Sequence, residues 1–180
     1  MKHLIFTVLL ALAYSLAYSQ TQEKQVDSLK KSPIIFVDSV LVSWADLKKY
    51  DPNDIASVTV YKYSPESKNY NSQADETIYV ETKQFSTKRF LKYFKSRSQD
   101  FNKLLASQQS DNSFQYILNG EVLNKDYEGK LAAINDKDFK SITIIRKDEL
   151  VNKYGNTDKT FGIVIVSDVP EYSPVPKEKL

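Results

Sequence analysis

The side chains that most enzymes use for catalysis and metal binding are nearly absent from this chain. None of its 180 residues is Cys, and its only His and only Met, His3 and Met1, lie at the N-terminus. Imidazole, thiolate and thioether groups activate Ser and Cys nucleophiles and bind zinc, haem iron and copper. Only carboxylates, Lys, Tyr, Ser or a hard cation could supply chemistry elsewhere. We therefore expect no catalytic residue and no cofactor.

Oxygen ligands for a hard cation gather in two short segments, 51–54 ("DPND") and 135–138 ("NDKD"). Ca²⁺ binds such groups, but an EF-hand loop has Gly at its sixth and Glu at its twelfth position, and neither segment does. Asp and Asn also cap helix N-termini. The sequence favours capping of two short helical turns, and we expect no metal site.

Aromatic side chains are the remaining candidates for a binding surface. Trp44, the only Trp, lies beside a predicted turn, Tyr61 lies near the end of a predicted strand, and Tyr63 follows that strand. Aromatic residues are enriched in protein interfaces and can stack on sugars. Tyr is also an ordinary strand residue with one face on a core. The three residues are therefore a possible interaction surface, with Trp44 as its strongest candidate.

The composition is typical of one compact soluble domain or two very small ones, since 41% of the residues are hydrophobic and 27% are charged. The 25 basic and 23 acidic residues give a net charge of +2 and are spread along the chain. Without a strong positive field we expect no nucleic-acid partner.

The first 19 residues are typical of a secretory signal peptide. A basic start precedes an apolar run over 4–17, and Ala17-Tyr18-Ser19 places small residues where signal peptidase cleaves. The run is shorter than the roughly 20 residues that span a bilayer, and no later run reaches that length. We predict cleavage after Ser19 or, alternatively, after Ala17. The mature protein would be periplasmic or extracellular and would have no membrane span.

The mature chain repeats itself once, between a polar leader at 20–32 and a Pro-rich, flexible tail at 169–180. Each copy has a β-rich run, a capped helical turn, a second strand, a crossover and a final strand. The first copy is 33–85, with "PIIFVDSVLV", "ASVTVYK" and "TIYVETK". The second is 113–168, with "FQYILNGEVL", "KSITIIRK" and "FGIVIVSD". This pattern predicts an α+β fold of two tandem strand–turn–strand–helix–strand repeats.

Local patterns predict how these elements are buried. Val58 and Val60, and equally Ile142 and Ile144, alternate with Thr, which predicts strands with one buried face. The second crossover, "DELVNKYG", predicts a helix that Gly155 stops in the left-handed position.

A longer amphipathic helix over 86–112 is predicted to join the two copies. Phe90, Phe94 and Phe101 recur at helical spacing, and Lys and Arg surround the polar side. The Asp, Gln and Ser residues toward its end favour a solvated charged face over a membrane or nucleic-acid surface.

These ordered motifs resemble the plug domain of TonB-dependent outer-membrane receptors. That family combines a Val-Asp-Gly strand end, an Asn-Pro-Asn-Asp-Ile turn, a Tyr-Gly turn and a final Gly-Val-Ile-x-Ile strand. The first copy matches in "PIIFVDSVLV" and "DPNDIASVTVYK", and the second in Tyr154-Gly155 and 161–165. Ser39 replaces the first Gly, and 180 residues cannot supply a receptor barrel. The resemblance implies a free-standing plug-like module without catalytic residues.

Together these features predict an exported, non-enzymatic module that contacts another protein of the cell envelope. A glycan-binding or small-ligand-binding module that uses exposed aromatic residues is the alternative. A hydrolase that depends on paired carboxylates is a third possibility, for which the sequence offers no specific pair.

Overall fold

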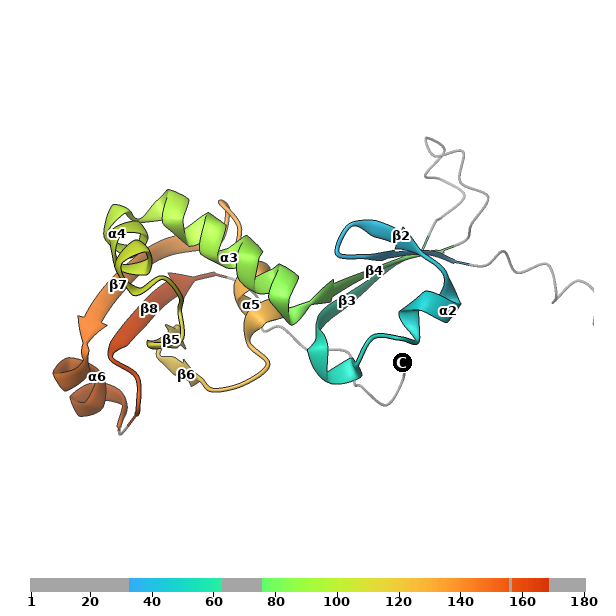
Figure 1. Ribbon diagram of the computed structural model, residues 1–180. Helices are drawn as coiled ribbons and strands as arrows, with labels where there is room; N and C mark the ends of the chain where they lie inside the picture. The colour runs from blue at the N-terminus through green and yellow to red at the C-terminus, as the bar shows by residue number, and fades with distance from the viewer. Residues whose placement is uncertain (1–32, 63–75, 156, 169–180) are drawn as a thin grey trace, which may run out of the picture. The chain divides into compact units, whose positions relative to one another are not determined.

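The computed structural model describes residues 33–62, 76–155 and 157–168 (Figure 1). The predicted signal peptide, leader and tail, the first crossover and Tyr63 lie outside these residues. The described part has the predicted α+β fold, with helices and two four-stranded mixed sheets of the same strand order. None of its helices is long and apolar enough to cross a membrane.

Contacts within the chain divide it into two compact parts, which do not correspond to the two sheets. The described residues of the smaller part are strand ends at 33–34, 61–62 and 76–77. Within it, Lys62 Nζ lies 3.7 Å from a Glu76 carboxylate oxygen. The described residues of the other part are 35–60, 78–155 and 157–168, and they include the helices and most of the strands described below.

The first sheet has the order β2-β1-β4-β3. Strands β1 and β2 pair antiparallel, with Phe36 opposite Leu41. Two short helical segments lie between β2 and β3. The elements of this sheet are β1 (Ile34–Val37), β2 (Val40–Val42), α2 (Trp44–Leu47), the 3-10 helix η2 (Pro52–Asp54), β3 (Ile55–Lys62) and β4 (Glu76–Thr82).

The second sheet repeats this order as β6-β5-β8-β7. Strands β5 and β8 are parallel, and the other two pairings are antiparallel. Its elements are β5 (Phe114–Leu118), β6 (Glu121–Leu123), α5 (Glu128–Ala132), β7 (Phe139–Arg146), α6 (Lys147–Tyr154) and β8 (Phe161–Ser167). The two-copy organisation predicted from the sequence is therefore present as two similar sheet units.

The predicted connecting helix is two helices, α3 (Lys83–Arg97) and α4 (Gln99–Gln108). The helical region begins earlier than the predicted residue 86, because the Thr82 hydroxyl accepts a hydrogen bond from Phe85 N at 3.2 Å and caps α3. Ser98 has an extended backbone, with φ −139°, and its hydroxyl caps α4 by accepting from Phe101 N at 3.1 Å. The prediction of a single helix over 86–112 is therefore wrong.

Each β-rich run that opens a copy is a hairpin rather than one strand. Its two turn residues are both left-handed: Asp38 and Ser39 have φ 50° and 71°, and Asn119 and Gly120 have φ 51° and 87°. Two consecutive positive φ angles define the type I′ turn, whose twist matches that of paired strands.

Helices cover both faces of the second sheet. Phe90, Phe94 and Phe101 of α3 and α4 are buried on one face, and Leu150 of α6 is buried on the other beside Ile117 and Ile145. The predicted apolar stripes of these helices are confirmed. The edge strand β7 contributes to both faces, because Ile142 and Ile144 pack against the first cluster and Ile145 belongs to the second, so the prediction of one buried face is wrong for it.

The corresponding prediction also fails in β3, where Val58 is half-buried and Val60 is 48% exposed. Gly155 ends α6 as predicted, but with φ 91° and ψ −178° it lies outside the left-handed helical region. That conformation is one that essentially only Gly adopts.

Candidate functional site

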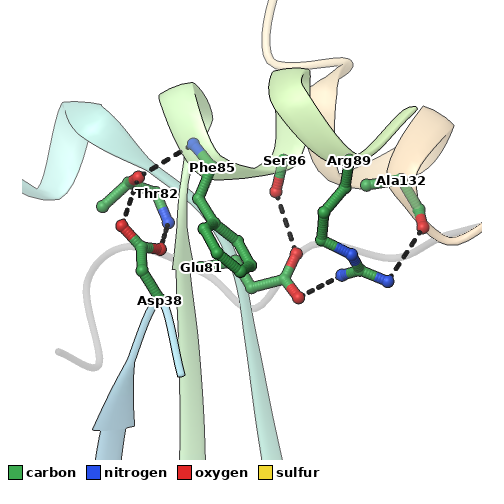
Figure 2. A network of polar contacts seen from close by, with 7 residues as sticks. All are labelled: Asp38, Glu81, Thr82, Phe85, Ser86, Arg89 and Ala132. Atoms are coloured by element: carbon green, nitrogen blue, oxygen red, sulfur yellow. Dashed lines mark hydrogen bonds and ion pairs between the residues drawn. The ribbon is translucent and has the colours of Figure 1, made fainter. Parts of the chain in front are cut away.

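The hairpin turn of the first sheet is held to the last strand by Asp38. Its backbone N donates to the Val80 carbonyl at 2.9 Å. Its carboxylate accepts from Thr82 N at 2.7 Å and from the Thr82 hydroxyl at 2.8 Å, as Figure 2 shows. The turn side chain thus fixes the junction of β4 and α3.

Asn119 makes the same contacts in the second sheet. Its backbone N donates to the Ile165 carbonyl at 2.9 Å, and its side-chain oxygen accepts from Ser167 N at 3.0 Å. Its amide nitrogen also donates to the Ser167 carbonyl at 2.8 Å. Position by position, Val80 therefore corresponds to Ile165, and Thr82 corresponds to Ser167.

The charged side chains at the start of α3 are engaged in the fold. Glu81 accepts from the Ser86 hydroxyl at 3.0 Å and pairs with Arg89, whose guanidinium also reaches the Ala132 carbonyl at 3.5 Å (Figure 2). Farther along the helix, Arg97 pairs with Asp136. The basic face of α3 thus consists partly of structural ion pairs.

The two oxygen-rich turns act as caps. Asp51 accepts from Asn53 N at 2.8 Å, and Asn135 accepts from Lys137 N at 2.9 Å. The predicted capping is confirmed at both. No group of three or more His, Cys, Asp or Glu side chains is arranged for a metal ion within the described ranges.

Trp44, the strongest interaction candidate, lies at the edge of a cavity of about 280 Å³. Its side chain is 48% exposed, and that of Tyr50 is 39% exposed. The cavity lies between the α2–η2 segment and the sheet. Its lining residues are Trp44, Leu47, Lys48, Tyr50, Pro52, Ile55 and Val80, which we call the Trp44 pocket.

Local capping positions Trp44. The Ser43 hydroxyl accepts from Asp46 N at 3.1 Å and donates to the Asp46 carboxylate at 2.7 Å, so α2 starts at Trp44. Lys49 Nζ lies 2.7 Å from the same carboxylate. Hydrogen bonds from Lys49 and then Ser43 lower the pKa of Asp46 to about 2, so it stays charged.

Lys48 is the charged residue among those that line the Trp44 pocket. Asp46 pairs with Lys49, and Lys48 has no ion-pair partner among the described residues. The pocket thus combines aromatic and aliphatic walls with one positive charge. It can bind an apolar group that carries negative charge nearby.

Tyr61, another of the predicted surface residues, does not line this pocket. Tyr61 is exposed near the end of β3, and Tyr63 lies outside the described residues. Sequence reasoning missed Leu47 and Tyr50, which line the pocket with Trp44. The available signal was that Trp44, Leu47 and Tyr50 follow one another in steps of three residues, because residues three apart share one side of a helical turn.

Comparison of the chain with protein-family models, with curated proteins and with solved structures finds no match. The resemblance to the plug domain of TonB-dependent receptors therefore stays a prediction. The Trp44 pocket is the feature on which a function can be argued.

Proposed function

We propose that this protein is an exported, non-enzymatic, plug-like module that contacts another protein of the cell envelope through the Trp44 pocket. The exposure of Trp44 beside an apolar cavity carries the proposal. The signal-peptide pattern at 1–19 supports the compartment, and the plug-like motifs support a role in protein contact rather than catalysis.

The energetics suit a protein contact. A Trp side chain buries roughly 150–250 Å² when fully covered, and about half of that remains exposed for Trp44. Covering roughly 100 Å² of apolar surface contributes about 2.5 kcal/mol. This is the magnitude expected of a residue that dominates a protein interface.

Co-purification from an envelope fraction tests the proposal. The wild-type chain should retain a partner that Trp44→Ala loses. Leu41→Ala is the matched control, because Leu41 is also exposed but does not line the pocket, and it should retain the partner. If Trp44→Ala retains the same proteins as wild type, the pocket is not the contact surface.

A glycan-binding module is the second candidate, because Trp44 and Tyr50 present two exposed aromatic rings at one cavity. Titration with oligosaccharides separates the two. Since Trp44 is the only Trp, a saturable change in its fluorescence on adding glycan would favour glycan binding.

A further inference from the structure

The Trp44 pocket has a counterpart in the second sheet unit. The equivalent turn contacts match Val80 of the pocket with Ile165. Ile55 and Phe139 likewise correspond, since each opens a strand directly after a capped turn. The two sheet residues of the pocket therefore have known equivalents in the second unit.

A helix fills the place of the pocket in the second unit. Ile165 is fully buried in one cluster with Phe90 and Phe94 of α3. The Phe139 ring lies 6.4 Å from the Phe94 ring, and its plane is perpendicular to the Tyr93 ring at 5.8 Å. Tyr93 and Phe94 thus contact the equivalent of Ile55, and Phe90, four residues before Phe94, belongs to the cluster that buries the equivalent of Val80.

In the first unit, the described residues that line the equivalent position come from the α2–η2 segment and the sheet, and no residue of α3 or α4 is among them. Trp44 and Tyr50 remain substantially exposed around the cavity, and Lys48 stands beside it without an ion-pair partner in the described part of the chain. Within the described ranges, the position is therefore built as in the second unit, but without the side chains that α3 supplies there.

We propose that the Trp44 pocket receives an amphipathic α-helix of a protein partner. The helix inserts aromatic side chains spaced four residues apart, as Phe90 and Phe94 do in the second unit, and presents acidic side chains to Lys48. This inference rests on the proposed function and names the partner's chemistry. A helix, rather than a strand, follows from the equivalent contact, and the acidic flank follows from the charge of Lys48.

A synthetic peptide tests the inference on the intact protein. The probe has the sequence of residues 83–98 with Lys88→Glu, Arg89→Glu, Lys92→Glu, Lys95→Glu and Arg97→Glu, which leaves one Lys and five Glu and gives its side chains a net charge of −4. The control peptide also carries Phe90→Ala and Phe94→Ala. Neither peptide contains Trp, so Trp44 alone reports binding.

The acidic peptide should shift the Trp44 emission to shorter wavelength in a saturable way. The control peptide should bind more than roughly tenfold more weakly, because it lacks the two anchoring rings. Lys48→Glu should weaken binding of the acidic peptide roughly two- to tenfold, and added salt should weaken binding to wild type.

Three results would overturn the inference. They are the absence of a saturable shift at millimolar peptide, equal binding of both peptides, and a Trp44 shift on raising the concentration of the protein alone, which would assign the pocket to a second copy. Each leaves the co-purification result with Trp44→Ala standing on its own. Failure of the helix and failure of the protein-contact function are therefore distinguishable.

Discussion

Ser39 is a strained residue in a turn whose counterpart is relaxed, and Ser39→Gly should stabilise the protein. The two hairpin turns have nearly the same backbone, but the second left-handed position holds Ser39 in one and Gly120 in the other. An L-residue in the left-handed region costs roughly 1–2 kcal/mol, and Gly avoids this cost.

The gain is partly offset in the unfolded chain. Gly has more conformations to lose on folding, which offsets about 0.4–1 kcal/mol. The net stabilisation by Ser39→Gly should therefore be about 0.5–1 kcal/mol. Gly120→Ser is the matched reverse control. A Cβ at Gly120 would meet nothing within 4 Å, so its expected destabilisation of similar size comes from the backbone alone.

Urea unfolding followed by Trp44 fluorescence measures the first change, because Trp44 lies in the same sheet unit as Ser39. Urea unfolding followed by circular dichroism measures the effect of Gly120→Ser. Ser39→Gly should raise the urea midpoint without changing the slope. A lowered midpoint for Ser39→Gly, or a raised one for Gly120→Ser, would refute the assignment of matching type I′ turns.

Three further changes test the core and its ionisation. Gly162→Ala should destabilise by about 1–3 kcal/mol in thermal unfolding, because its Cβ would lie 2.6 Å from Ile145 Cγ1; unchanged stability would contradict this close packing. Ile163→Asp should unfold the protein, because it buries a carboxylate. Val60→Asp, at an exposed site, should lower the free energy of unfolding by about 1 kcal/mol or less, as followed by circular dichroism. Equal effects of the two substitutions would contradict the difference in burial. Burial raises the pKa of Tyr116, so the urea midpoint should fall with rising pH only above about pH 10, where this tyrosine ionises in the unfolded chain. Tyr116→Phe should make this fall of the midpoint with pH shallower. An unchanged dependence of the midpoint on pH in the variant would contradict the burial of the Tyr116 hydroxyl.

The sequence predicted the elements whose cause is local. Capping by Asp51 and Asn135 needs only neighbouring backbone N–H groups, and the Phe90, Phe94 and Phe101 spacing needs only a helix that meets a core. The hairpins were predictable as well. Asn119-Gly120 is the strongest short hairpin signal, and Asp38-Ser39 follows from the repeat.

Other features depend on tertiary contacts that a periodic pattern does not contain. The break at Ser98 leaves the apolar spacing of α3 and α4 intact, so periodicity alone favoured one helix. The exposure of Val60 depends on what covers β3, although its alternation matches that of Ile144 in β7. The Trp44 pocket also depends on tertiary contacts, because Val80 lines it from a strand that is distant in the sequence.

The two sheet units differ in how much of their apolar surface the described helices cover, and this difference is the energetic basis for binding at the Trp44 pocket. In the second unit, Phe90, Phe94 and Phe101 are almost fully buried within the same chain, so folding alone gains their hydrophobic stabilisation. In the first unit, Trp44 still exposes apolar surface at the equivalent position, and the proposed partner would add the corresponding stabilisation by covering it. Because a ligand that binds only the folded state stabilises that state, occupancy of the pocket should stabilise the first sheet unit. If the proposed partner binds there, the exposed apolar surface of Trp44 therefore links partner binding to the stability of this sheet unit.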